Sequence, residues 1–238
     1  MRIEAAQMGL RGYWLARGEL CGGRFEPVDA NLDVSFVQAA ARRLDELSWP
    51  ETVYRDCVFS RTRLPRQAYF GNARFERCVF DGARLRDLTS TGEAQFVGCT
   101  FRGKIQDVRF WGTPDRHAAA LGRERNAFTG NDFTGADLLD VEFRNIDLHA
   151  QRFPGLPGYA VLDRVDRRVA YALAAVAEWP DDEIKGRAER SLRIGAEFAV
   201  RDNGGHALVS RSWVDRRLPP DVRDRIFRML VDYSDDQQ

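Results

Sequence analysis

The sequence predicts a β-solenoid followed by an α-helical domain, and three observations lead to this fold class. An apolar residue recurs at every fifth position over part of the chain, a longer unit recurs every 21 residues upstream of it, and the composition becomes helix-forming after Pro154. Repeats of this kind are typical of solenoids, in which each repeat is one structural unit stacked on its neighbours.

The five-residue period runs without interruption between Asn126 and Phe153. Its apolar positions are Phe128, Phe133, Leu138, Phe143, Leu148 and Phe153. A helix repeats about every 3.6 residues and a strand about every 2, so neither produces this step. We therefore expect these side chains to fill the axis of a stacked structure.

A second period of 21 residues relates residues 52–59 to residues 73–80 and 94–101. Four steps of five plus one extra residue account for it. The large and small positions that recur are Cys57, Phe59, Phe75, Cys78, Phe80, Phe96, Cys99 and Phe101. We expect the cysteines to pack as small buried residues rather than to bind a metal, because zinc requires four converging ligands and not a straight row.

The units Ala136-Asp137-Leu138, Asn131-Asp132-Phe133, Ala83-Arg84-Leu85 and Ala73-Arg74-Phe75, together with the three Cys-x-Phe units, carry a family resemblance. The chain resembles the pentapeptide-repeat family, whose consensus is A-(D/N)-L-x-x, over residues 52–153. This resemblance implies a right-handed, four-sided β-helix with one pentapeptide on each side.

The expected organisation has three parts. Residues 1–50 form an N-terminal segment with an amphipathic helix over 33–49. The five-residue spacing of Leu10, Leu15, Leu20 and Phe25 indicates either a degenerate first coil or a coincidence in a Gly-rich strand pair. Residues 51–153 form the β-helix, interrupted at 111–125 by a loop or short helix that is either a tolerated surface insertion or a binding contact. Residues 154–238 form a helical domain with helices over 159–177, 181–200, 206–217 and 220–233. Its role is either to cap the solenoid end or to form a homodimer.

Charge is unevenly distributed, although the formal net charge is zero. Residues 54–125 carry 14 basic and 8 acidic residues, a net +6, whereas residues 126–153 carry 2 basic and 5 acidic residues, a net −3. This segregation favours a partner of complementary charge. The candidate contact residues are Arg63, Arg84, Arg109, Trp111, Arg116, His117, Arg123, Asp132, Asp137, Glu142 and Asp147.

Several classes of function are disfavoured. The neutral total argues against bulk electrostatic binding to nucleic acid or membrane, and no apolar run is long enough for a signal-peptide core or a membrane span. We therefore expect a cytoplasmic protein, and its four cysteines are too few for a disulfide framework. The histidines His117, His149 and His206 lie in three different regions without a ligand or nucleophile motif, and no phosphate-binding glycine loop is present. We expect no enzyme and no cofactor.

The sequence thus predicts a non-enzymatic protein that offers a rigid surface to a protein partner, as an inhibitor or immunity protein or as a scaffold. The family resemblance implies an alternative, a bacterial resistance protein that modulates DNA gyrase or topoisomerase by mimicking DNA. The net +3 over residues 54–153 counts against mimicry, which needs a continuous acidic face. An enzyme acting through the C-terminal helices is the outside alternative.

Overall fold

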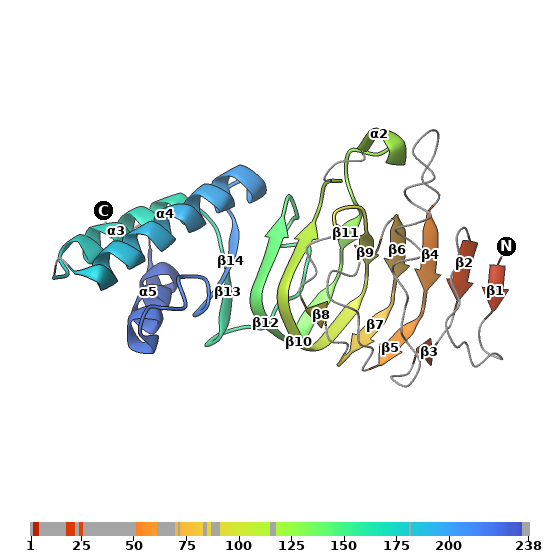
Figure 1. Ribbon diagram of the computed structural model, residues 1–238, viewed down its shortest axis with the longest axis horizontal. Coiled ribbons are helices and arrows are strands. Elements are labelled where there is room, and N and C mark those ends of the chain that lie inside the picture. Colours follow the sequence, from red (N-terminus) through yellow and green to blue (C-terminus); the bar gives the residue numbers. More distant parts are fainter. Residues whose placement is uncertain are drawn as a thin grey trace. The chain divides into compact units, whose positions relative to one another are not determined.

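The computed structural model describes residues 2–4, 18–21, 24–25, 51–60, 70, 72–82, 85–86, 91–114, 118–180 and 182–234. The chain divides into two compact units, Met1–Arg152 and Phe153–Gln238. Each unit is described by itself (Figure 1).

The first unit contains two six-stranded sheets whose strands all run parallel to their neighbours. The first sheet has the order β1 (Arg2–Glu4), β2 (Gly18–Cys21), β4 (Thr52–Arg55), β6 (Ala73–Glu76), β9 (Gln95–Val97) and β11 (Phe128–Thr129). The second has the order β12 (Asp132–Arg144), β10 (Thr100–Trp111), β7 (Val79–Asp81), β5 (Val58–Ser60) and β3 (Arg24–Phe25), with β8 (Leu85–Arg86) also paired to β10.

The 21-residue period of the sequence is also the offset between neighbouring strands. Thr52 pairs with Ala73 in the first sheet, and Val58 pairs with Val79 in the second. Chemically similar residues therefore lie side by side in successive strands. The offset grows between β10 and β12, where Ile105 pairs with Leu138 after a register shift.

The core lies between the two sheets and consists of two columns of stacked aromatic rings. Phe59, Phe80, Phe101 and Phe133 of the second sheet stack with centroid separations of 4.9, 4.9 and 4.5 Å. Rings of the first sheet form a second column beside the first. Rings of the two columns contact each other edge to face, as Phe75 and Phe80 do. Such aromatic pairs contribute about 0.5–1.5 kcal/mol each beyond the area they bury.

The thirteen residues that the sequence assigns to the interior are all buried, with at most 8% of their surface exposed: Cys57, Phe59, Phe75, Cys78, Phe80, Phe96, Cys99, Phe101, Phe128, Phe133, Leu138, Phe143 and Leu148. The three cysteines are free thiols. Two of them donate to carbonyls in the preceding strand of the first sheet, Cys78 Sγ to Tyr54 and Cys99 Sγ to Phe75, both at 3.3 Å. We call these three the thiol row.

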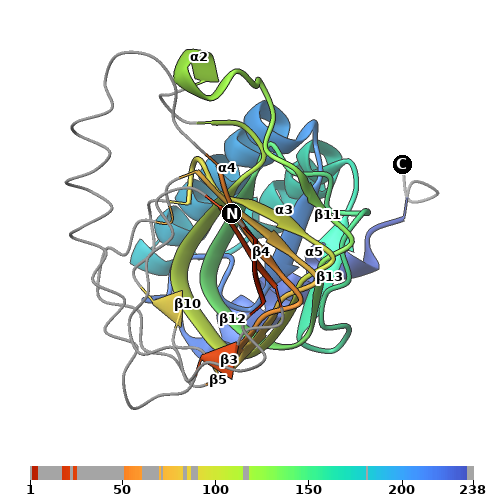
Figure 2. The same ribbon diagram turned by 90° about the vertical axis from the view of Figure 1, so that its right-hand side faces the viewer.

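The prediction of a closed, four-sided β-helix is wrong. The described strands of the first unit gather in two parallel sheets instead of four separate faces, and the chain as a whole is of a mixed, parallel α/β type. The physical reason lies in β10 and β12, which span 12 and 13 residues. Their mutual pairing continues through the places where a five-residue period predicts corners. Both strands bend instead, at Asp107 and Asp140, whose φ angles are 54° and 50°, and Figure 2 shows them as nested curved ribbons.

The interruption of the five-residue period contains the short helix α2 (Ala118–Leu121). It projects away from the two sheets in both views (Figures 1 and 2). The segment leaves β10 at Gly112 and returns at Asn126, where the Asn126 N–H donates to the Gly112 carbonyl at 2.9 Å.

The second unit combines helices with a two-stranded antiparallel sheet. Its elements are β13 (Tyr159–Leu162), α3 (Val165–Ala177), α4 (Glu183–Asn203), β14 (Ala207–Ser210) and α5 (Pro220–Asp232). The core includes Val169 and Ala172 of α3, Leu192 of α4 and Ile226 of α5. The α4 helix begins where the Asp182 carboxylate accepts the Lys185 N–H at 3.0 Å and ends at Gly204, whose φ is 61°.

Three of the four helices predicted for the C-terminal domain are present as α3, α4 and α5, but the prediction of a helix over 206–217 is wrong. Residues 207–210, expected within a helix over 206–217, form β14, and residues 159–162 form its partner β13. The cause is a nonlocal pairing, since Leu162 lies opposite Ala207 and Tyr159 opposite Ser210. Alternating burial of Ala207 and Val209 is the pattern of a strand.

Two predictions concern the N-terminal segment, namely a helix over 33–49 and a first coil over 10–25. The helix over 33–49, Leu10 and Leu15 lie outside the described residues, whereas Leu20 and Phe25 lie on β2 and β3. None of the helices in the described part of the chain is both long and apolar enough to cross a membrane.

Candidate protein-binding surface

Four outward side chains meet where β10 and β12 end, beside the base of the insertion. The strand register places Arg109 opposite Glu142 and Trp111 opposite Arg144. These are neighbouring positions on adjacent parallel strands, so their side chains can touch. We call these four residues the Trp111 cluster.

The cluster is held together by ion pairs and a cation–π contact. Glu142 Oε2 accepts from Arg109 Nε at 3.1 Å and from Arg144 Nη2 at 2.6 Å. The Arg144 guanidinium lies over the Trp111 ring, 5.0 Å from its centroid. Arg144 is therefore fixed on two sides, and its side chain is only 17% exposed. Arg109 and Glu142 stay 43% exposed and form the accessible part of the cluster.

The backbone under the cluster is tightly packed. The Gly112 N–H donates to the Arg144 carbonyl at 2.8 Å, and Asn126 Nδ2 donates to the Trp111 carbonyl at 3.0 Å. A Cβ atom at Gly112 would lie 1.9 Å from the Asn145 carbonyl oxygen, so only glycine allows this approach. The surface is therefore prearranged by the fold, which lowers the entropy that binding would cost.

The structure brings together three of the predicted contact residues, Arg109, Trp111 and Glu142. It adds Arg144, which sequence reasoning missed although it directly follows the five-residue position Phe143. The candidates Arg63, Arg84, Arg116 and His117 lie outside the described residues.

Asp132 and Asp147, two further acidic candidates, accept local hydrogen bonds. Asp132 accepts from the Thr134 hydroxyl at 2.7 Å, which holds the pKa of Asp132 below its ordinary value, and it lies 3.2 Å from Arg152. Asp147 caps a turn by accepting the backbone N–H of His149 at 3.0 Å. Asp137 is exposed and lies opposite Lys104 in the strand register.

Arg123 differs from the other candidates because it points into the first unit. Its Nε donates to Asn126 Oδ1 at 3.1 Å and its Nη1 to Asn72 Oδ1 at 2.6 Å. Its side chain is 17% exposed. It therefore anchors the insertion and is poorly placed to contact a partner.

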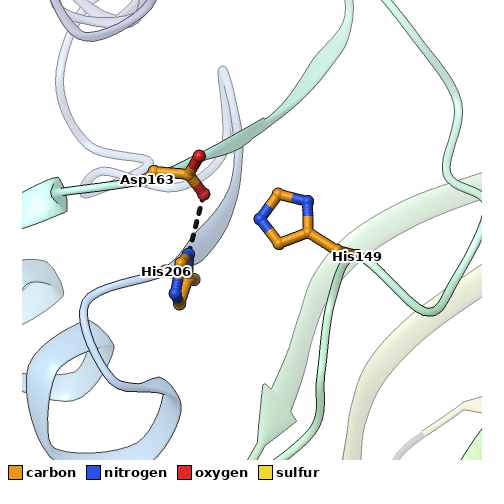
Figure 3. A group of neighbouring side chains, drawn as sticks. All are labelled: His149, Asp163 and His206. Atoms are coloured by element: carbon orange, nitrogen blue, oxygen red, sulfur yellow. Dashed lines mark hydrogen bonds and ion pairs between the residues drawn. The ribbon is translucent and has the colours of Figure 1, made fainter.

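In the second unit, Asp163 and His206 form a pair at the end of the β13–β14 sheet (Figure 3). The distance from His206 Nδ1 to Asp163 Oδ1 is 2.7 Å, and the side chains are 41% and 52% exposed. An Asp–His pair orients an imidazole in many enzymes, but it needs a nucleophile or metal beside it. Ser210, the nearest serine along the chain, shares its hydrogen bond with Ser212 instead. His149, also drawn in Figure 3, belongs to the first unit.

Comparisons with known proteins do not identify the chain: no family model, no curated protein and no solved structure matches it. The resemblance to the pentapeptide-repeat family therefore stays a prediction from the sequence pattern.

Proposed function

We propose that the chain is a non-enzymatic protein that binds a protein partner through the Trp111 cluster of its first unit. The observation that supports this proposal is the fixed arrangement of Arg109, Trp111, Glu142 and Arg144 on two paired strands. Tryptophan and arginine are the residue types that most often dominate the energy of protein interfaces.

The charge of the cluster favours a protein over a nucleic acid. Two arginines share one carboxylate, so the cluster carries a net +1, far less than the row of cations that phosphate recognition requires. Arg109 uses its Nε for Glu142, and its side chain is 43% exposed, so a partner can reach the guanidinium. A carboxylate or backbone carbonyl of a protein partner fits those donors.

DNA mimicry toward gyrase is the alternative that the geometry favours less. A mimic needs an uncompensated acidic row, but Asp132 lies beside Arg152 and Glu142 beside Arg109 and Arg144. Neutralised carboxylates do not reproduce the field of a phosphate backbone. A supercoiling assay with and without a fluoroquinolone tests this alternative directly, and protection of gyrase at micromolar protein would support it against our proposal.

An enzyme is the outside alternative, and the Asp163–His206 pair is the group on which it would depend. Ser210, the nearest serine to His206 along the chain, forms its hydrogen bond with Ser212. Among the protein-binding roles, an inhibitor or immunity protein needs one tight partner and a scaffold needs several.

The buried free thiols fit a reducing compartment, which supports a cytoplasmic location.

Homodimerisation of the second unit would suit the scaffold role. Ile194 and Phe198, one helical turn apart on α4, are 52% and 39% exposed, and such adjacent apolar side chains are common at interfaces. Replacing Ile194 with Glu should halve the mass seen by light scattering if α4 forms a dimer. A mass that is monomeric before the change would remove this role.

The test of the main proposal compares three forms of the full chain in affinity capture from the host. Wild type should retain a partner that Trp111→Ala loses, because truncating a hot-spot tryptophan costs about 2 kcal/mol or more, or about 30-fold in affinity. Tyr171→Ala is the matched control, since Tyr171 is an aromatic residue of the second unit with 41% exposure. If Trp111→Ala and wild type bind the captured protein equally well, the Trp111 cluster is not the interface.

A further inference from the structure

Three polar residues occupy the same position in successive 21-residue repeats: Glu51, Asn72 and Glu93. Each directly precedes the first residue of a repeat, so the parallel register carries all three to one side of the first sheet. Asn72 and Glu93 are only 7% and 5% exposed. A row of buried polar side chains is costly unless its hydrogen bonds are made.

Arg123, which comes from the insertion, contacts all three of these residues. Its Nη1 donates to Asn72 Oδ1 at 2.6 Å and lies 4.0 Å from Glu51 Oε1. Its Nη2 donates to the Glu93 carbonyl oxygen. Its Nε donates to Asn126 Oδ1 at 3.1 Å. Acceptors thus surround the guanidinium on each of its three nitrogens.

The supporting residues are themselves fixed. Asn126 is 6% exposed, and its Nδ2 donates to the carbonyls of Gly92 at 2.6 Å and Trp111 at 3.0 Å. Glu51 Oε1 accepts from Gln95 Nε2 at 2.5 Å, and Gln95 is 4% exposed. Glu51 and Asn126 are therefore held in place by contacts that do not involve Arg123.

Charge and shape both select a guanidinium. Glu51 and Glu93 supply negative charge, and their influence opposes the burial that lowers the pKa of Arg123. Desolvation is the larger effect, which is consistent with a cation removed from water. A planar fork with five N–H donors matches acceptors lying in several directions, whereas a lysine ammonium would concentrate its charge at one point.

We propose that Glu51, Asn72, Glu93 and Asn126 form a guanidinium-binding site that the chain fills with its own Arg123, and that this contact fixes the position of residues 118–125 of the insertion. The ligand class is an arginine side chain or a small alkylguanidinium. Arg123 is thus a positioning residue for the insertion, whose outward residues Ala119, Glu124 and Arg125 are exposed. This site does not depend on the proposed partner, because all of its contacts lie within the chain.

Chemical rescue tests the site. Arg123→Ala removes the guanidinium and leaves its acceptors, so the melting temperature of the first unit should fall. Ethylguanidinium at low millimolar concentration should restore at least half of that loss, because a ligand that binds only the folded state stabilises it. Ethylammonium at the same concentration should restore none of it, and wild type should not respond to either compound.

One further variant and a refolding experiment make the result decisive. Arg123→Ala combined with Asn72→Leu keeps the vacancy but removes an acceptor, and it should no longer respond to ethylguanidinium. If Arg123→Ala does not fold alone, refolding with ethylguanidinium should recover the native circular dichroism. A folded Arg123→Ala variant that gains no stability from ethylguanidinium would overturn the proposal. Partner binding by the Trp111 cluster would be unaffected by that outcome, so the two proposals fail separately.

Discussion

Replacing Gly112 with alanine is the sharpest test of how the first unit is packed. The added Cβ would lie 1.9 Å from the carbonyl oxygen and 2.6 Å from the carbonyl carbon of Asn145, and 3.1 Å from Ile146 Cγ1. Gly112 does not have a positive φ, so the cost is steric alone. Because the first two atoms belong to the backbone, no rotamer change relieves the clash.

Small-to-large substitutions in a packed core lower the free energy of unfolding by about 1–3 kcal/mol. A backbone clash belongs at the upper end, so we expect about 3 kcal/mol. For a unit of 152 residues this corresponds to a fall in melting temperature of roughly 6–12 °C. The hydrogen bonds from Gly112 N–H to Arg144 and from Asn126 N–H to Gly112 should weaken as well.

The assay must separate the two units, because their unfolding need not be one two-state transition. Hydrogen exchange of β10 and β12 amides, together with urea unfolding, reports on the first unit. Gly135→Ala is the control: it lies on β12, and its Cβ would meet mainly the flexible Arg102 side chain, 3.1 Å away. We expect that control to stay within about 0.5 kcal/mol of wild type. An equally small effect of Gly112→Ala would refute the close approach of Gly112 to Asn145.

Three other predictions follow from the described contacts. In α4, Gly186→Ala should stabilise the second unit by up to about 1 kcal/mol because nothing lies within 4 Å of the new Cβ, whereas Gly195→Ala, whose Cβ would lie 2.4 Å from the Trp213 ring, should destabilise it; calorimetry showing the same sign for both would contradict the packing. The thiol row should resist a thiol reagent at pH 8 until the chain unfolds, because its members are buried. For Cys78, a hydrogen bond with Cys57 lowers the pKa, but a hydrogen bond with Cys99 and burial raise it to about 12. Labelling of these residues in the native protein would disprove their burial. Hydrogen bonds from Arg55 and then Arg74 hold the pKa of Glu76 below its ordinary value, so this carboxylate contributes stability above its unfolded pKa that is lost as pH falls through the folded pKa. Melting curves between about pH 3 and 7 should therefore show a weaker acid dependence in Glu76→Gln than in wild type, and parallel curves would count against it.

The sequence anticipated which residues repeat but not how the repeats are divided into sheets. A 21-residue offset between similar segments favours in-register pairing, and Thr52 does pair with Ala73. A five-residue apolar period, however, does not tell a bend within a continuous strand from the end of a strand. The positive φ of Asp107 and Asp140 allows β10 and β12 to bend without ending. The side-chain pattern of the sequence does not predict these bends.

The missed elements of the candidate surface and of the second unit have a common cause. Residues 207–210 form a strand because residues 159–162 pair with them, and local propensity cannot report a partner so distant in the chain. The sequence predicts Arg123 as a partner contact, whereas the structure turns its side chain into the first unit. Its acceptor Asn72 lies 51 residues away in sequence, so only the folded register reveals the site.

The reach of Arg123 has a consequence for how such a chain can change in length. Arrays of similar repeats gain and lose whole units easily during evolution, because each unit contacts only its neighbours. Here one guanidinium touches positions from three successive repeats, Glu51, Asn72 and Glu93. Deleting or duplicating a 21-residue unit between Glu51 and Glu93 would separate the insertion from one of its anchors. The contacts of Arg123 therefore constrain the number of repeats between Glu51 and Glu93.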